Sequence, residues 1–259
     1  MRTARQKPDV ARKDFVAALE SGLKVIETFG PEHPRLTLSD VARQTGLSRA
    51  AARRYLLTLS SLGYAGHDGK HFWLTPRVLR LGHAQLSSTP LPQLAQPVLE
   101  SVGQATGEVA SIAVLDGSEV VFLARSQTRR IVSASVSVGT RLPVYCTSTG
   151  KVLLAALPER EMRHILERLR PVRHTPRTKT RREDLLQAIR DARSNGYAVS
   201  DEEYEIGLRS ISVPVYSASG TVAAAMSAST QSGRMTVEQM IRDLLPPLHR
   251  ASRLLSQML

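Results

Sequence analysis

The sequence predicts an α+β protein with two domains, the smaller of which is an N-terminal winged helix-turn-helix. Residues 37–62 read as two short amphipathic helices joined by a tight turn, and a hairpin pattern follows them at once. Later in the chain, strand patterns come first, then helices, then strands again. Because 259 residues suit two cores, we divide the chain into residues 1–75, a linker helix over 76–90 and a second domain over 91–259.

The first helix of the motif has clear start and stop signals. A bracing helix, expected over about Phe15 to Phe29, precedes it. Thr37 can accept a hydrogen bond from the backbone of Asp40, whose carboxylate lies where the helix dipole favours an anion. Gly46 follows, where the chain must leave the helix with a positive φ. These signals predict a short helix ending in a tight turn.

The second helix is rich in arginine. Ser48 is placed to cap it, and apolar residues recur at helical spacing, namely Ala52, Leu56, Leu59 and Leu62. Arg49, Arg53 and Arg54 project from its N-terminal half, which a recognition helix places against base edges. Surface arginines on a helix pair also occur in proteins that do not bind DNA, so this pattern alone leaves both interpretations open.

A hairpin directly after this helix favours DNA binding. The turn Gly-His-Asp-Gly-Lys at residues 66–70 separates two β-prone stretches, which is the arrangement of a wing. Residues near the tip are placed to meet phosphate or the minor groove, whereas Phe72 and Trp73 are expected to pack at its base. The predicted DNA contacts are Thr37, Ser48, Arg49, Ala51, Arg53, Arg54, His67 and Lys70.

Composition agrees with a nucleic-acid partner. The chain holds 35 Lys and Arg against 23 Asp and Glu, a net charge of +12, and residues 1–90 are the more basic part per residue. Basic residues at positions 2–13 form an arm that either helps to bind DNA or is a solvated terminus. One cysteine excludes an internal disulfide, and neither a membrane-spanning run nor a secretory signal stands out, so a cytoplasmic protein is expected.

The second domain reads as an antiparallel sheet with helices packed on it. Helices are expected over residues 91–106, 149–157, 159–169, 181–196 and from 236 to the end. Strands are expected over residues 109–115, 119–124, 131–138, 210–216 and 221–229, with turns at Asp116-Gly117 and at residues 217–220. The segment around residues 87–92, with its prolines and serines, marks the domain boundary.

Three segments give the chain a resemblance to the IclR family of bacterial transcriptional regulators. They are FVAALESGLKVIETF from residue 15, GTRLPVYCTSTGKVLLAALP over 139–158 and GYAVSDEEYEIGLRSISVPV over 196–215. Residues 33–59 and the Arg129-Arg130 pair further resemble the branch that controls aromatic acid catabolism, with PobR, PcaR and PcaU as members. The resemblance implies a winged-helix domain, a linker helix and an effector-binding domain with a GAF-like fold, assembled as dimers or dimers of dimers.

A small-acid pocket is expected in the second domain. Ser148, Thr149 and Gly150 fall at a helix start, where backbone N–H groups suit a carboxylate. Ser227 and Ser229 share one face of a strand, next to Ser210, although strand serines also often just satisfy local backbone. Tyr145 either faces the ligand or packs. With the resemblance added, the expected effector residues are Ile131, Ala134, Leu142, Tyr145, Ser148, Thr149, Ser200, Leu208, Ser210, Ser227 and Ser229. Ser210 stands where the family often has cysteine.

The sequence gives little support for metal binding, a reactive thiol, acyl-enzyme chemistry or nucleotide binding. The acidic cluster over residues 201–205 lacks histidine at ligand spacing, and Arg209 is a nearby structural partner, so no metal or cofactor is expected. Cys146 reads as a buried, inert thiol because no base lies near it in sequence. Ser148-Thr149-Gly150-Lys151 matches S-x-x-K, but the partner motifs of serine acyl enzymes are missing, and the run is not a P-loop. The basic stretch over 160–182 reads as a solvated surface more readily than as a second nucleic-acid surface.

These patterns predict a DNA-binding transcriptional regulator, not an enzyme, that responds to a small carboxylate. The resemblance makes 4-hydroxybenzoate the first choice of effector, with protocatechuate, β-ketoadipate or another small acid as alternatives. From another class, a small-molecule enzyme with an accessory DNA-binding module would require a nucleophile and base that the sequence does not offer. An architectural DNA binder without an effector would leave the second domain unexplained.

Overall fold

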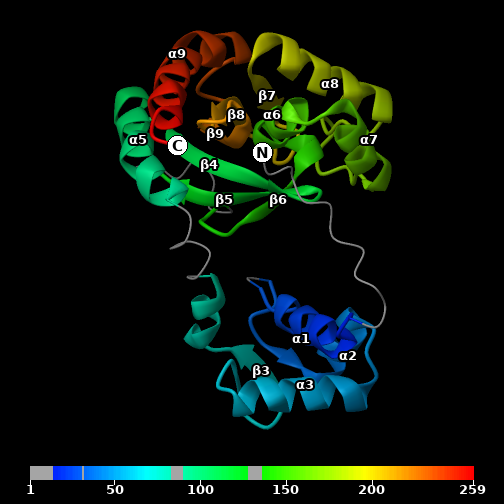
Figure 1. The fold of residues 1–259 in the computed structure, drawn as a ribbon. Helices are drawn as coiled ribbons and strands as arrows, with labels where there is room; N and C mark the ends of the chain where they lie inside the picture. Colours follow the sequence, from blue (N-terminus) through cyan, green and yellow to red (C-terminus); the bar gives the residue numbers. More distant parts are fainter. Residues whose placement is uncertain (1–13, 31, 83–89, 128–135) are drawn as a thin grey trace. The chain divides into compact units, whose positions relative to one another are not determined.

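The structure is a computed structural model that describes residues 14–30, 32–82, 90–127 and 136–259 (Figure 1). The chain forms two compact units, residues 1–88 and 89–259. Each unit has its own hydrophobic core. In the described part of the chain, no helix is long and apolar enough to cross a bilayer.

In its described residues, the N-terminal unit has three helices and a small sheet, followed by a short helical stretch over residues 79–82. Its helices are α1 (Ala17–Glu27), α2 (Leu38–Thr45) and α3 (Arg49–Ser61), followed by a 3-10 turn, η1 (Pro76–Val78). Its strands are β1 (Leu36–Thr37), β2 (Ala65–His67) and β3 (His71–Leu74), in the order β1-β3-β2 and antiparallel. The core includes Val25, Leu36, Val41, Ala52, Leu56 and Phe72. The hairpin β2–β3 is the predicted wing, and β1, which the sequence pattern did not reveal, adds a third strand to it.

The helix ends are built as the sequence predicts. The Thr37 hydroxyl accepts from the Asp40 amide at 3.3 Å, and the Asp40 carboxylate accepts from the Thr37 amide at 3.2 Å. Gly46 ends α2 with a φ of 70°, and Ser48 caps α3 by accepting from the Ala51 amide. One expected core position was wrong. Leu62 is 53 % exposed because α3 stops at Ser61 and the chain turns away.

The C-terminal unit contains one antiparallel sheet of six strands in the order β6-β5-β4-β9-β8-β7. The strands are β4 (Val109–Asp116), β5 (Glu119–Arg125), β6 (Arg141–Pro143), β7 (Ala198–Asp201), β8 (Leu208–Tyr216) and β9 (Val222–Gln231). The helices are α5 (Leu91–Thr106), α6 (Ser148–Ala156), α7 (Glu159–Arg168), α8 (Arg182–Asn195) and α9 (Val237–Ser256), with a 3-10 turn, η2 (Val144–Cys146), before α6.

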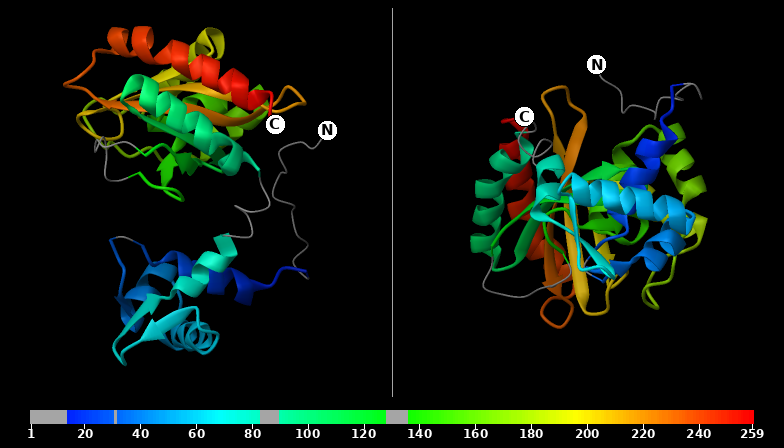
Figure 2. Two further views of the ribbon diagram at one scale, coloured as in Figure 1. Left: turned by 90° about the vertical axis from the view of Figure 1, so that its left-hand side faces the viewer. Right: turned by 90° about the horizontal axis from the view of Figure 1, so that it is seen from below.

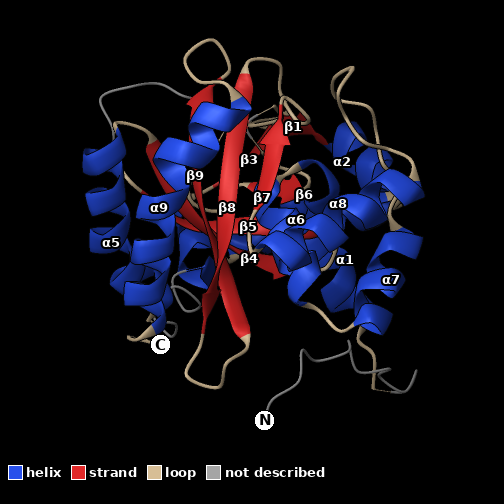
Figure 3. Ribbon diagram, turned by 90° about the horizontal axis from the view of Figure 1, so that it is seen from above, coloured by secondary structure: helices blue, strands red, loops and turns tan. Residues whose placement is uncertain are grey.

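Helices cover both faces of this sheet. Helices α5 and α9 lie side by side on one face (Figure 2), where they bury Ile112, Val213 and Met226. On the other face are α6, α7 and α8 (Figure 3), which pack with Phe122 and Leu142. Alternation along the strands therefore sends odd-numbered residues of β4 and even-numbered residues of β8 toward α6. The sheet face under α6 is where the polar strand residues gather.

The elements differ from the sequence prediction at three places, some of which lie partly outside the described residues. The strand expected over residues 131–138 is not formed by residues 136–138, which are irregular, and residues 131–135 lie outside the described part. The edge strand of the sheet is β6 instead. Strand β7 was not expected at all. It is only four residues long, and its pattern is hidden in an acidic segment. Of the expected linker helix, residues 79–82 are helical and 83–89 lie outside the described part.

Candidate functional site

The N-terminal half of α3 presents arginine to solvent. Arg49, Arg53 and Arg54 are all exposed, while Ala52 and Leu56 on the opposite side are fully buried. Residues 48–61 contain no acidic side chain, so the charged side chains of this helix are all basic. Exposed guanidinium groups on one helix face can reach base edges or phosphates. Thr37, Ser48 and Ala51 lie at the starts of α2 and α3, on the two helices of the motif.

The wing holds a further arginine that the sequence analysis missed. The Arg35 guanidinium lies 4.3 Å from the centre of the Trp73 ring, and its Nη1 is 3.5 Å from the Asp68 carboxylate. Asp68 is itself fixed because it accepts from the amides of Lys70 and His71. Arg35 is therefore a guanidinium held in place next to the exposed residues His67 and Lys70 of the wing. Its signal, a basic residue just before a two-residue strand, is too weak to find from sequence.

A pocket lies in the C-terminal unit between the sheet and the start of α6. Of the expected effector residues it is lined by Leu142, Ser148, Thr149, Ser200, Leu208, Ser210, Ser227 and Ser229. Residues that the sequence analysis did not include also line it, namely Val109, Ser111, Phe122, Arg125, Val136, Cys146, Thr147 and Tyr204. Apolar side chains make up much of the wall. No carboxylate is among these described lining residues.

The polar part of the wall is two rows of side chains that cross the sheet. Strand register places Arg125 opposite Ser111, Ser111 opposite Ser227, and Ser227 opposite Ser212. The neighbouring row runs through Val109, Ser229, Ser210 and Ser200. Because side chains two residues apart on a strand share a face, both rows point toward α6. This cross-strand register could not be read from sequence.

Some of these hydroxyls already have partners. Ser148 Oγ lies 2.8 Å from Ser210 Oγ and 2.7 Å from Ser212 Oγ, and Ser200 donates to the Cys146 carbonyl at 2.9 Å. These bonds attach the start of α6 to β7 and β8. By contrast, the hydroxyls of Ser111, Thr149 and Ser229 form no side-chain hydrogen bond within the described chain. Those three are the ones available to a ligand.

Two features of the wall attract an anion. Arg125 is half-buried, and burial lowers the pKa of its guanidinium, which stays protonated nonetheless. It donates to the Val136 carbonyl. The second feature is the start of α6, where Thr147 caps Gly150 and the amides of Ser148 and Thr149 have no partner inside the helix. Gly150 is required there, because a Cβ would lie 2.2 Å from the Val144 carbonyl oxygen.

One expected residue is placed differently, and two lie outside the described part of the chain. Tyr145 does not line the pocket: it is 5 % exposed, and its hydroxyl donates to the Val172 carbonyl and lies 3.0 Å from His174 Nε2. Its ring belongs to the hydrophobic core on the α6 side of the sheet, and its hydroxyl is held by the segment after α7. Ile131 and Ala134 lie outside the described residues.

The acidic cluster is held by cations of the chain. Asp201 pairs with Arg209 and Arg177, and Glu203 with Lys151 and Lys179. Within the described ranges, no three His, Cys, Asp or Glu side chains come together as a metal cluster would require. Cys146 is fully buried, and burial raises the pKa of its thiol to about 12, as expected for an unreactive cysteine.

A basic helix-turn-helix in one unit and a polar-walled pocket in the other are typical of ligand-responsive transcriptional regulators. Two family models match the chain: the IclR helix-turn-helix domain over residues 18–69 and the bacterial transcriptional regulator IclR C-terminal domain over 83–257. The chain belongs to the IclR family. It is thus a transcriptional regulator and not an enzyme.

Relatives connect the chain to one branch of that family. It is 45 % identical to the Pca regulon regulatory protein of Pseudomonas putida, over 93 % of this chain and 83 % of that one. It is 40 % identical to the p-hydroxybenzoate hydroxylase transcriptional activator of Acinetobacter baylyi, over 94 % and 92 %. An IclR homologue from Microbacterium hydrocarbonoxydans, solved with 4-hydroxybenzoate, superposes with a TM-score of 0.76 at 30 % identity, covering 93 % and 98 %. The resemblance to the branch that controls aromatic acid catabolism is confirmed.

Proposed function

We propose that this regulator controls genes of aromatic acid catabolism in response to a small aromatic carboxylate, with 4-hydroxybenzoate the first choice. The observation that carries the proposal is the pocket wall, which combines apolar side chains, Arg125 and unpartnered hydroxyls without a carboxylate. The solved homologue with 4-hydroxybenzoate supports the ligand class. Protocatechuate, β-ketoadipate and other small acids remain the alternatives.

Within the pocket, the carboxylate would bind at Arg125 or at the Ser148 and Thr149 amides. Arg125 offers a charged donor, which makes a stronger hydrogen bond than a neutral amide. Ser111 and Ser229, on the two serine rows, can then meet a ring hydroxyl, while Phe122 and Leu142 contact the ring. We favour Arg125 for the carboxylate because it is the sole cationic side chain among the described lining residues.

The DNA-reading surface would be the N-terminal half of α3 with the wing. We assign Arg49, Arg53 and Arg54 to base or phosphate contacts, with Thr37, Ser48 and Ala51 at the helix starts, and His67 and Lys70, now joined by Arg35, on the wing. Arg53→Ala should cost ~1 to 3 kcal/mol on the specific promoter site and little on random DNA, measured by fluorescence anisotropy. Equal losses on both DNAs would reduce Arg53 to a phosphate contact.

A regulator of this kind would work in the cytoplasm as a homodimer or dimer of dimers. Helix α1 and the residues before it leave an apolar stripe exposed, formed by Phe15, Val16, Leu19 and Leu23. Such a stripe is typical of a protein–protein interface, and a two-fold dimer would cover it with its own copy. The division into a DNA-binding domain over 1–75, a linker helix over 76–90 and an effector domain over 91–259 is part of the same proposal.

Regulation would follow from a shift between arrangements of the linked domains. An effector that binds one arrangement more tightly raises its population, and DNA must then change effector affinity by the same factor. The test is to measure promoter affinity with and without 4-hydroxybenzoate, and 4-hydroxybenzoate affinity with and without promoter. Equal factors in the two directions support the proposal. Unchanged DNA affinity at saturating effector would contradict it.

A further inference from the structure

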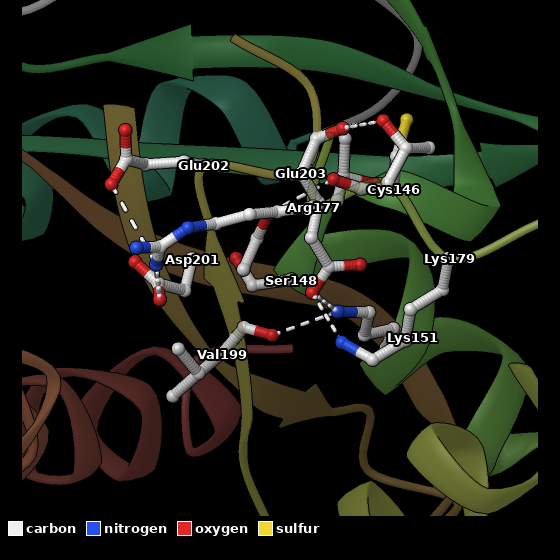
Figure 4. Close-up of polar contacts among 12 residues, drawn as sticks. Cys146, Ser148, Lys151, Arg177, Lys179, Val199, Asp201, Glu202 and Glu203 are labelled. Atoms are coloured by element: carbon white, nitrogen blue, oxygen red, sulfur yellow. Dashed lines mark hydrogen bonds and ion pairs between the residues drawn. The ribbon is translucent and has the colours of Figure 1, made fainter. Parts of the chain in front are cut away.

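Helix α6 carries a buried lysine that does not line the effector pocket. Lys151 is 3 % exposed, and its Nζ donates to the Val199 carbonyl at 2.9 Å and to Glu203 Oε1 at 2.5 Å (Figure 4). Burial lowers the pKa of this lysine, and the Glu203 carboxylate opposes that effect. A charged group inside the domain is costly unless its partners are well placed. The Val199 carbonyl and the Glu203 carboxylate compensate the charge of Lys151 at this buried position.

The two ends of the Lys151–Glu203 ion pair adjoin different walls of the pocket. On its own side, Lys151 lies one turn from Ser148 and Thr149 at the start of α6. On the other side, Glu203 precedes Tyr204, which lines the pocket in the turn between β7 and β8. The ion pair therefore joins the helix start that attracts an anion to the turn that carries an aromatic wall.

The turn itself needs holding. Glu202 has a φ of 56°, a left-handed conformation that a non-glycine residue adopts at a cost. Thr175 and Thr178 donate to the carbonyls of Glu202 and Glu203, and Lys179 pairs with Glu203 Oε1 at 2.9 Å. All of these contacts come from the segment after α7. Among the described cations, Lys151 alone reaches Glu203 from α6.

We infer that Lys151 is a positioning residue of the effector pocket, acting through Glu203 to fix the Tyr204 turn relative to the start of α6. The inference rests on the proposed function, since it assigns a role in the same pocket. If it holds, losing Lys151 changes how tightly and how selectively the pocket binds acids. Losing Lys179, which pairs with the same oxygen from outside, leaves the pocket nearly as it is.

The test compares Lys151→Met with Lys179→Met in the full chain. Met preserves much of the length of lysine and removes its charge, and in either variant Glu203 retains one lysine, so no charge is left buried alone. Isothermal titration with 4-hydroxybenzoate and 3-hydroxybenzoate separates affinity from the fraction of active protein. Hydrogen–deuterium exchange without ligand, over residues 146–151 and 202–207, reports on the two walls directly. Lys151→Gln is the second variant in case Lys151→Met does not fold.

The inference predicts roughly tenfold weaker binding in Lys151→Met, a factor that corresponds to about 1.4 kcal/mol, with an altered ratio between the two acids. Lys179→Met should bind within about twofold of wild type. Exchange should rise in both segments for Lys151→Met only. A lower active fraction with unchanged affinity, or equal effects of the two variants, would overturn the inference, as would failure of both Lys151 variants to fold. If wild type binds neither acid, the proposed effector class fails, and exchange alone still decides the role of Lys151.

Discussion

At the scale of residues, we expect Arg125 to decide whether the pocket selects acids. Arg125→Gln keeps a donor but removes the charge, so we expect about 10- to 100-fold weaker binding of 4-hydroxybenzoate, from the loss of ~1.5 to 3 kcal/mol. Arg141→Gln is the matched control, because Arg141 pairs with Asp116 and Glu119 on the surface. Calorimetric titration checks both. Equal losses in the two variants would show that general charge, not a pocket contact, attracts the acid.

We expect the pocket serines to divide into those that contact the effector and those that hold the structure. Ser229→Ala removes a hydroxyl without a partner and should weaken effector binding with little change in thermal stability. Ser148→Ala breaks two hydroxyl contacts to β8 and should lower stability by about 1 kcal/mol, whatever it does to binding. Thermal unfolding and titration of both variants check this division. Unaltered stability in Ser148→Ala would mean that its contacts to β8 contribute nothing.

The Cys146 thiol should be inert at pH 8 in the folded protein. Its pKa is raised to about 12 by burial, so the reactive thiolate is absent well above neutral pH. In the unfolded chain the thiol has its ordinary pKa near 9 and loses its proton at lower pH than in the folded protein. The free energy of unfolding therefore falls as pH rises above about 9. A thiol reagent should label the protein only after unfolding. Labelling of the native protein at pH 8 would contradict the burial.

At the scale of elements, the junction of η2 and α6 is the least tolerant point of the pocket. A Cβ on Gly150 would lie 2.2 Å from the Val144 carbonyl oxygen and 2.4 Å from its Cα, where only backbone could yield. Gly150→Ala should therefore cost about 3 kcal/mol or more of unfolding free energy. Gly233→Ala, with nothing within 4 Å of its Cβ, should stay within about 0.5 kcal/mol. Denaturant unfolding of both tests this, and equal stabilities would refute the close approach.

Elements with local sequence signals were predicted correctly, whereas an element fixed by long-range pairing was missed. Local signals placed the helix-turn-helix well, because the Thr37–Asp40 capping box, Gly46 and Ser48 act within a few residues. The same is true of the turn at Gly117 and of the end of α5 at Gly107. Strand β7 was missed because a four-residue edge strand has too short a pattern, and its place beside β8 is set by long-range pairing.

The candidate site was predictable in part for the same reason. The start of α6 and the serines of β8 and β9 follow from local spacing. Arg125, Ser111 and Tyr204 do not, because strand register and the path of a turn bring them to the pocket from segments far apart in the sequence. Sequence also left open whether Tyr145 faces the ligand or packs, because the residues that hold its hydroxyl, Val172 and His174, lie far along the chain.

At the scale of the whole molecule, the exposed apolar stripe on α1 should govern assembly. Leu19→Lys places a charge in the middle of the stripe, where Leu19 is 63 % exposed, so the fold should persist while self-association weakens. Light scattering after size-exclusion chromatography measures the mass of wild type and variant. Leu79→Lys, at an exposed leucine outside the stripe, is the control. An unchanged mass in Leu19→Lys would place the interface elsewhere.

The most direct test of the account is thermal unfolding of the full chain with 4-hydroxybenzoate and with 4-hydroxybenzamide, its uncharged counterpart. A ligand at 100 times its dissociation constant adds ~2.7 kcal/mol, so the acid should raise the unfolding temperature by several degrees. The amide should do so only weakly, and the Arg125→Gln variant should lose the preference. Equal shifts with acid and amide, or no shift with the acid in folded protein, would contradict a pocket built for an aromatic carboxylate.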